Sequence, residues 1–162
     1  AGSDAEFAEA QTLLGDMAKS IVRCGKVGSG QVVKLCNNMI LGQHMVAVSE
    51  AMLMGTKLGV DAGTLAGVIN TSTGRCWSSD SYNPYPNLMP GVPASNNYAG
   101  GFGATLMLKD LGLAIEAAKT ADMNVTGALN AQKVYTEMTA KPELNQLDFG
   151  GVIKQIDSQK AQ

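Results

Sequence analysis

The chain has 162 residues, which is enough for one compact domain with a buried core. Hydrophobic residues make up 45% of it and charged residues 16%, and the formal net charge is −2 at pH 7, a balance typical of a globular protein. This charge provides no basic field for nucleic acid or anionic lipid, and the sequence lacks the run of about 18 apolar residues that a membrane span requires. We therefore expect neither a nucleic-acid partner nor a membrane partner.

The first 25 residues predict a helix followed by a strand. Ser3 and Glu6 have the spacing of a capping box, and apolar residues then recur at helical intervals over residues 4–19. Residues 20–24 form a short β-like run that stops at Gly25. A lone strand needs a sheet to join, and the rest of the sequence predicts none.

The remaining sequence predicts helices joined by one long loop. Residues 31–58 form a helical pattern that is apolar nearly all round, as expected of a central buried helix. A shorter helix follows Asp61, two more are predicted over residues 105–121 and 127–140, and a last one is opened by Asp148. The predicted fold class is therefore all-α: a helical bundle around one long central helix, with one orphan strand near the N-terminus.

The long loop, residues 71–103, contains four of the five prolines and five aromatic residues. Disordered segments are poor in aromatic residues, so this composition indicates an ordered loop. Loops of this length within compact domains are usually functional.

The cysteines and the histidine do not form a metal-binding pattern. Cys24, Cys36 and Cys76 are widely spaced, and His44 is the one histidine. Zinc sites require cysteine and histidine ligands at short, paired spacings, so we expect no metal and interpret the cysteines as free buried thiols. His44 lies within the apolar pattern of the long helix and is interpreted as a core histidine.

The stretch GKVGSGQVVKLCNN, residues 25–38, has the glycine spacing of a phosphate-binding loop without its ligands. Gln31 and Val32 stand where a P-loop has lysine and then serine or threonine. A lysine follows only at Lys34, with Asn38 one helical turn later on the same face. A lysine among apolar residues can become a general acid or base, and an asparagine can orient a hydroxyl or a carboxylate. The alternative, which spacing alone favours, is a Lys34 that reaches solvent and an Asn38 on the surface.

Lys109 is a further candidate, in the stretch FGATLMLKDLGLA. Phe102, Leu106 and Lys109 fall on one helical face, which would place Lys109 on the same side as the apolar stripe. The alternative is a solvated Lys109 beside its neighbour Asp110.

Three stretches together resemble the 3-hydroxyisobutyrate dehydrogenases of the β-hydroxyacid dehydrogenase family. They are GKVGSGQVVKLCNNMI (residues 25–40), TGRCWSSDSYNP (residues 73–84) and GVPASNNYAGGFGATLMLKDLGLA (residues 91–114). The first resembles an element shared across the family, whereas the other two favour this enzyme over the related glyoxylate and tartronate semialdehyde reductases. The resemblance implies that Lys34 is the catalytic lysine, that Asn38 binds the substrate, and that Lys109 and Phe102 contact the NAD cofactor.

The resemblance also implies a larger enzyme that oxidises a 3-hydroxy acid with NAD in valine breakdown. Residues 1–25 then correspond to the end of a dinucleotide-binding domain, and residues 26–162 to a helical substrate-binding and oligomerisation domain. A homo-oligomer (dimer or tetramer) is implied, located in the mitochondrial matrix of a eukaryote or the cytoplasm of a bacterium, and the chain alone is expected to be inactive. Two alternatives stay open: a helical dimerisation module without catalysis, and a related semialdehyde reductase.

Overall fold

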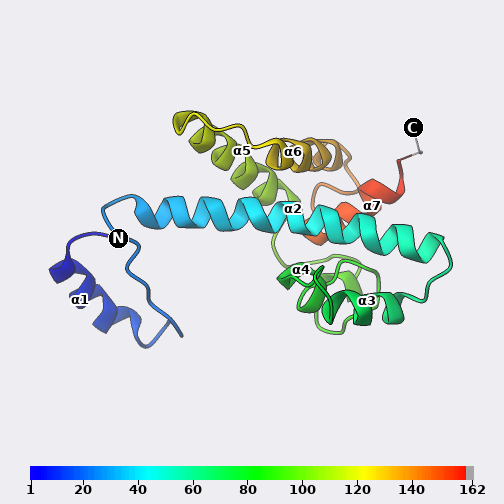
Figure 1. Cartoon of the computed structure of the whole chain (residues 1–162), viewed down its shortest axis with the longest axis horizontal. Coiled ribbons are helices and arrows are strands. Elements are labelled where there is room, and N and C mark those ends of the chain that lie inside the picture. The colour runs from blue at the N-terminus through cyan, green and yellow to red at the C-terminus, as the bar shows by residue number, and fades with distance from the viewer. Residues whose placement is uncertain (160–162) are drawn as a thin grey trace. The chain divides into compact units, whose positions relative to one another are not determined.

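The computed structural model describes residues 1–159, and its regular elements are helices (Figure 1). No strand occurs among these residues, which confirms the all-α class and shows that the strand predicted over residues 20–24 is wrong. A strand exists only through pairing with another strand, and no described segment pairs with this one. None of the described helices is long and apolar enough to cross a membrane. The elements are α1 (Asp4–Leu14), α2 (Ser29–Lys57), α3 (Ala62–Asn70), α4 (Trp77–Asp80), the 3-10 helix η1 (Pro93–Ser95), α5 (Ala104–Thr120), α6 (Thr126–Thr139), the 3-10 helix η2 (Phe149–Gly151) and α7 (Val152–Asp157).

Local capping signals are confirmed in the structure. At the start of α1, the Ser3 N–H donates to Glu6 Oε2 at 2.8 Å and the Glu6 N–H donates to Ser3 Oγ at 3.3 Å. At the start of α3, Asp61 accepts from the Thr64 N–H at 2.8 Å. Helix α1 ends before residue 19, because Gly15 follows Leu14 and none of the residues of α1 is buried to hold a longer helix.

The chain divides into two compact units, residues 1–37 and residues 38–162. In the first unit, Arg23 donates to the Gly2 carbonyl at 3.0 Å and pairs with Asp4 at 2.7 Å. The predicted assignment of residues 1–25 and 26–162 to two parts of a larger enzyme stays a prediction, and residues 160–162 lie outside the described residues.

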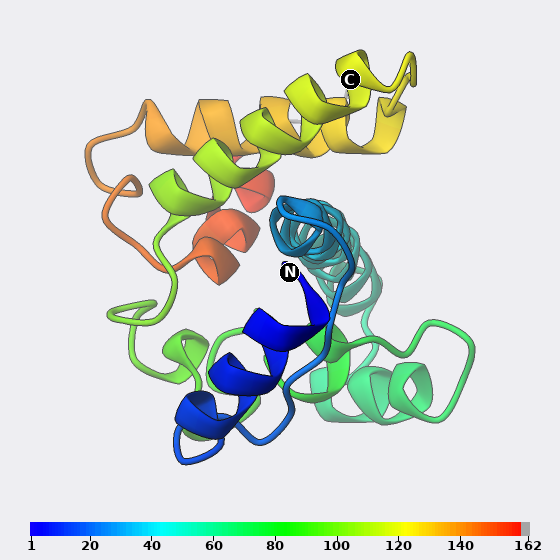
Figure 2. The same cartoon turned by 90° about the vertical axis from the view of Figure 1, so that its left-hand side faces the viewer.

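The core of the second unit lies between α2 and the hairpin that α5 and α6 form (Figure 1). Fully buried side chains such as Met45, Leu111 and Tyr135 each remove apolar surface from water, which stabilises the fold by about 1.5–3 kcal/mol per large side chain. A second cluster, built on Val48 and Met52, joins α2 to α3. Figure 2 looks along α2, with α5 and α6 above it and α3 below it.

One side of α2 is not covered by the rest of the described chain. Met54 is 63% exposed and Leu58 is 78% exposed, and His44 is also exposed. The interpretation of His44 as a core residue is therefore wrong, and the long helix is not buried all round. The cysteines are free as expected, but Cys36 is exposed and the other two are only half-buried.

The loop of residues 71–103 is ordered, as predicted, and Asp148 is its main anchor. The buried Asp148 carboxylate accepts from the Phe102 N–H at 2.8 Å, from the Tyr82 hydroxyl at 3.0 Å and from the Gly150 N–H at 2.8 Å. The Asp148 N–H in turn donates to the Tyr98 carbonyl at 2.9 Å. These bonds join the loop to the start of η2.

Gly101 lies against this anchor. Its φ is +66°, and an added Cβ would meet Asp148 Oδ2, the Tyr82 hydroxyl at 2.6 Å and Pro93 Cγ at 2.7 Å. The neighbouring Gly100 also has a positive φ, +80°, but nothing lies within 4 Å of its Cβ position. An alanine at Gly100 therefore introduces backbone strain alone, whereas an alanine at Gly101 introduces backbone strain and steric overlap.

We expect Gly100→Ala to lower the free energy of unfolding by about 1 kcal/mol, the cost of a left-handed backbone for alanine. Gly101→Ala adds overlap with packed groups and should cost at least about 2 kcal/mol more. Urea denaturation of both variants measures the difference. Equal losses would contradict the close packing at Gly101.

Candidate functional site

Asn38 and Asp110 are brought together from two helices. Asn38 lies on α2 and is half-buried, whereas Asp110 lies on α5 and is 2% exposed. The Asn38 Nδ2 donates to Asp110 Oδ2 at 2.6 Å. The nitrogen of the amide therefore faces the carboxylate, and this bond fixes the orientation of the side chain. The alternative of a surface-polar Asn38 therefore does not hold.

Lys109 pairs with the other oxygen of the same carboxylate. Its Nζ lies 2.9 Å from Asp110 Oδ1, and the Lys109 side chain is 55% exposed while that of Asp110 is 4% exposed. A buried carboxylate is costly unless it is paired and hydrogen-bonded, and the Asn38 amide and the Lys109 ammonium supply both. The exposed position of Lys109 beside Asp110 agrees with the solvated alternative and also leaves the ammonium accessible to an anionic ligand.

Phe102 lies at the end of a series of aromatic contacts. Its ring meets Phe149 edge-on at 5.8 Å, Phe149 stacks with Tyr82 at 5.6 Å, and Tyr82 stacks with Trp77 at 4.8 Å. Such pairs add about 0.5–1.5 kcal/mol each beyond the burial of their surface. Phe102 is half-buried, so part of its ring stays available for contact with a ligand.

Lys34 lies on α2 in the first compact unit, four residues before Asn38, and is exposed. Its ammonium therefore keeps contact with water in this chain, as the solvent-reaching alternative predicted. The role in catalysis that the resemblance implies for Lys34 stays a prediction.

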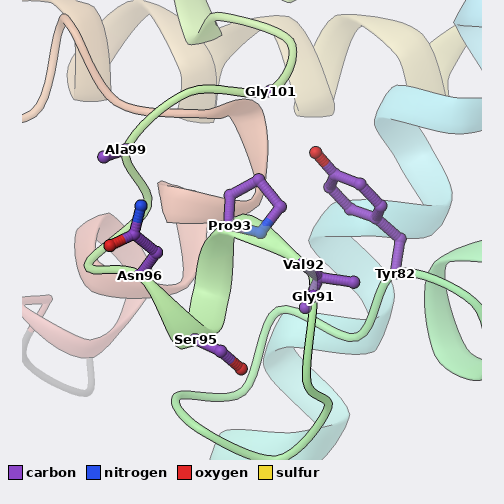
Figure 3. Close-up of a pocket in the computed structure, with 8 residues that line it drawn as sticks. All are labelled: Tyr82, Gly91, Val92, Pro93, Ser95, Asn96, Ala99 and Gly101. Carbon is purple, nitrogen blue, oxygen red and sulfur yellow. The ribbon is translucent and has the colours of Figure 1, made fainter.

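A pocket of about 480 Å³ opens in the ordered loop (Figure 3). Figure 3 shows Pro93 and Ser95 on η1, Asn96 immediately after it, and Tyr82 from the segment after α4. None of the four predicted site residues lines this pocket, which is formed by Tyr82, Gly91, Val92, Pro93, Ser95, Asn96, Ala99 and Gly101.

The titratable group of the pocket is Tyr82, whose hydroxyl donates to Asp148. Burial first, and then the nearby Asp148 charge, raise the pKa of Tyr82 well above its usual value. The hydroxyl is therefore protonated at neutral pH and acts as a donor, so the pocket favours binding over acid–base chemistry.

Two of the predicted site residues have the chemistry to contact a dinucleotide. Lys109 offers an accessible cation and Phe102 an aromatic surface, which suit one end of such a cofactor. The glycines before α2 do not follow a strand among the described residues, and a dinucleotide loop requires a strand before its glycine turn. No group of three or more metal-binding side chains occurs among the described residues.

Most of the chain matches a known protein family. A family model described as "NAD-binding of NADP-dependent 3-hydroxyisobutyrate dehydrogenase" matches residues 28–156. The match defines the class of the protein as a helical dehydrogenase domain. The chain belongs to the 3-hydroxyisobutyrate dehydrogenase family.

Similar proteins span eukaryotes and bacteria. The chain is 50% identical over 153 residues to the mitochondrial 3-hydroxyisobutyrate dehydrogenase of Pongo abelii. The matched region covers 94% of this chain and 45% of the relative. The chain is 49% identical to the Homo sapiens protein of the same name, over the same shares of the two chains. The chain thus spans about half the length of the curated relatives it matches.

Two solved structures have the same fold. The Mycobacterium tuberculosis 3-hydroxyisobutyrate dehydrogenase with L-serine aligns at a TM-score of 0.91 and 36% identity, over 97% of this chain and 53% of that one. The Salmonella typhimurium 3-hydroxyisobutyrate dehydrogenase aligns at a TM-score of 0.81 and 23% identity, over 94% of this chain and 51% of that one, and supports the fold alone.

Asp110 and Asp148 are the residues whose roles the sequence did not reveal. The sequence marks Asp110 only as the neighbour of Lys109, although it holds Asn38 from 72 residues away. The sequence marks Asp148 only as the first residue of a helix, although it anchors the long loop. The one signal in the sequence is an apolar residue directly after each, Leu111 after Asp110 and Phe149 after Asp148.

We expect the contact of Asp110 with Asn38 to be stronger than its contact with Lys109. A double-mutant cycle with Asn38→Ala and Asp110→Ala should give a coupling free energy of about 1.5–3 kcal/mol, because one partner is charged and buried. The control cycle with Lys109→Ala and Asp110→Ala should give less than about 1 kcal/mol, because Lys109 is largely solvated. Urea denaturation measures both, and a stronger Lys109 coupling would refute the ranking.

The anchor residue Asp148 should make stability depend on pH. Burial raises the pKa of the Asp148 carboxyl, and the N–H groups of Gly150 and Phe102 oppose the shift only in part. A folded pKa above the unfolded value gives a stability contribution that is present below the unfolded pKa and is lost as pH rises through the folded pKa. The free energy of unfolding of the wild type, relative to that of Asp148→Asn, should therefore fall as the pH rises above about 4, the ordinary pKa of an aspartate.

Asp61 is the matched control for this measurement. The Thr64 N–H lowers the pKa of the Asp61 carboxyl, so its contribution is present above the unfolded pKa and is lost as pH falls through the folded pKa. Urea denaturation of Asp148→Asn and Asp61→Asn across pH should give opposite trends relative to the wild type. The same trend in both variants would contradict the raised pKa of Asp148.

Proposed function

We propose that this chain is the substrate-binding and oligomerisation part of an NAD-dependent 3-hydroxyisobutyrate dehydrogenase. In this proposal the parent enzyme oxidises a 3-hydroxy acid to its semialdehyde in valine breakdown. The observation that carries the proposal is the Asn38 amide held at 2.6 Å by the buried Asp110, within two of the three family-like stretches. A side chain that is already held in one orientation can orient a substrate without first losing its own freedom. Such positioning lowers the entropic part of the activation barrier of the reaction.

Lys34 is the general acid and base in the proposed reaction. It lies four residues before Asn38 in the sequence, which is the spacing of two residues that share a helical face. The neutral amine accepts the proton of the substrate hydroxyl while the hydride leaves the adjacent carbon, and the ammonium returns the proton in the reverse direction. This transfer requires the Lys34 nitrogen within about 2.6–3.2 Å of the substrate oxygen.

Lys109 and Phe102 are the proposed contacts of the cofactor. NAD, when bound, accepts the hydride. The accessible Lys109 ammonium suits an anionic or hydroxyl group of the cofactor, and the partly exposed Phe102 ring suits a planar one. Because these residues offer few contacts, we place most of the cofactor binding on a preceding dinucleotide domain, and the family description leaves both NAD and NADP as candidates.

The substrate class is supported by the chemistry of a neighbour. The Mycobacterium tuberculosis structure contains L-serine, which is itself a 3-hydroxy acid. A mitochondrial location is proposed for a eukaryotic parent enzyme, since the names of the eukaryotic relatives include that compartment, and a cytoplasmic one for a bacterial parent. A homo-oligomer, dimer or tetramer, completes the proposal.

Substitution of Lys34 tests the mechanism. In the parent enzyme, Lys34→Ala should lower kcat by at least about 100-fold, because general acid–base catalysis contributes factors of this order. Steady-state kinetics with 3-hydroxyisobutyrate and NAD measures the loss, and sedimentation should show unchanged assembly. Near-wild-type turnover would refute the role of Lys34.

The isolated chain is the control for the domain assignment. It should bind and turn over 3-hydroxyisobutyrate with NAD far less than the parent enzyme, because the proposed dinucleotide domain is required. Turnover by the 162 residues alone would refute that requirement. The glyoxylate and tartronate semialdehyde reductase alternative is favoured instead if the parent enzyme prefers those substrates by kcat/KM.

A further inference from the structure

Tyr98 has a backbone conformation that is rare for a tyrosine. Its φ is +61°, in the left-handed region, and the residue is only 2% exposed. The other non-glycine residues with a positive φ in residues 1–159 are two asparagines and one aspartate, Asn87, Asn97 and Asp122. Short polar side chains tolerate this region, whereas a bulky aromatic residue is strained there. The surroundings of Tyr98 must therefore hold its backbone against this strain.

Hydrogen bonds and a ring contact hold Tyr98 in place. Its N–H donates to the Pro93 carbonyl at 2.7 Å, and its carbonyl accepts from the Asp148 N–H at 2.9 Å. Its hydroxyl donates to the Pro84 carbonyl at 2.8 Å, and Lys154 Nζ lies 5.0 Å from the centre of its ring. Strained residues that are held by several contacts at once occur mainly at binding and active sites. The conformation of Tyr98 therefore indicates a role beyond the packing of the loop.

The N–H and the carbonyl of Tyr98 are bonded to two different segments of the chain. The N–H is bonded to η1, at Pro93, and the carbonyl is bonded to Asp148, the residue before η2. The torsion angle φ lies between these two groups, so a change of φ alone turns one of them away from its partner. The left-handed backbone of Tyr98 therefore joins η1 to the start of η2.

Phe102 is bonded to the same segment that Tyr98 contacts. The Phe102 N–H donates to Asp148 Oδ2 at 2.8 Å, and the Phe102 carbonyl accepts from the Phe149 N–H at 2.7 Å. The Phe102 ring meets the Phe149 ring edge-on at 5.8 Å. Because the main chain of Phe102 is bonded to residues 148 and 149, and residue 148 is bonded to Tyr98, a shift of the Tyr98 backbone also moves the Phe102 ring.

We propose that Tyr98 is a positioning residue for the cofactor contact. Its left-handed backbone, held by the hydroxyl bond to Pro84, sets the position of Phe102 through Asp148. The inference rests on the proposed function, in which Phe102 contacts the cofactor. Tyr98 acts without touching the cofactor, because its own ring is buried. A contact that is in position before the cofactor arrives lowers the free-energy cost of binding.

Tyr98→Phe in the parent enzyme tests the positioning role. The change keeps the ring and removes only the hydroxyl, so the buried bond to the Pro84 carbonyl is lost and φ can relax. We expect the KM for NAD to rise about tenfold, because binding then includes the cost of bringing Phe102 back into position. The kcat at saturating NAD and the KM for 3-hydroxyisobutyrate should change by less than about twofold.

Tyr85→Phe is the matched control. Tyr85 packs against the same apolar cluster that contains Tyr98, and this change also removes one hydroxyl, but it leaves the bonds of Tyr98 in place. Both KM values should stay within about twofold of the wild type. Urea denaturation shows that each variant is folded. A purely structural Tyr98 would lower the free energy of unfolding in Tyr98→Phe without changing the KM for NAD.

A Phe102→Leu background tests whether Tyr98 acts through Phe102. Leucine keeps most of the apolar volume and removes the aromatic ring, so Phe102→Leu should itself raise the KM for NAD. Adding Tyr98→Phe should then raise this KM by less than about twofold further, because the ring that Tyr98 positions is gone. A rise in the KM for NAD that Tyr98→Phe causes only when the Phe102 ring is present supports the proposal.

Two outcomes would overturn this inference alone. They are an unchanged KM for NAD in Tyr98→Phe, and an equal rise of that KM in the wild-type and Phe102→Leu backgrounds. A parent enzyme without NAD-dependent turnover, or an unchanged KM for NAD in Phe102→Leu, would refute the proposed function and this inference with it. The two failures are therefore distinguishable.

Discussion

The conformation of the long loop, residues 71–103, depends on one buried carboxylate, that of Asp148. Its partners are hydrogen-bond donors rather than a cation: the Tyr82 hydroxyl and the N–H groups of Phe102 and Gly150. The Tyr82 hydroxyl belongs to a residue 66 positions away, so the bond closes a long stretch of chain. Because an unpaired buried acceptor is costly, the loop and the C-terminal segment are held in one arrangement.

This anchor also fixes the position of the candidate site. The Ala104 N–H at the start of α5 donates to the Leu147 carbonyl at 2.9 Å, one residue before Asp148, and Gly103 bridges to Asp148 itself. Helix α5 then carries Asp110 to Asn38 on α2. The orientation of the Asn38 amide therefore depends on the carboxylate of Asp110, which belongs to a helix whose start is bonded to the segment before η2.

Helix α2 presents different chemistry on its two sides. Asn38 and the buried Met45 face the core of the second unit, whereas Ile40 and Met54 are exposed on the other side of the helix. At 3.6 residues per turn, Asn38 lies about half a turn around the helix from Ile40.

The sequence by itself determined the helices, their caps at Ser3 and Asp61, the order of the long loop and the family-like stretches, because these depend on periodicity, turn chemistry and short motifs within a few residues of one another. Only the tertiary structure decided that Asp110 holds Asn38 and that Asp148 anchors the loop, because these contacts join residues far apart in the chain. It also decided that residues 20–24 form no strand and that His44 is exposed. Pairing and burial depend on what lies beside a segment in space, and an apolar pattern alone does not say whether its own chain or a partner covers it.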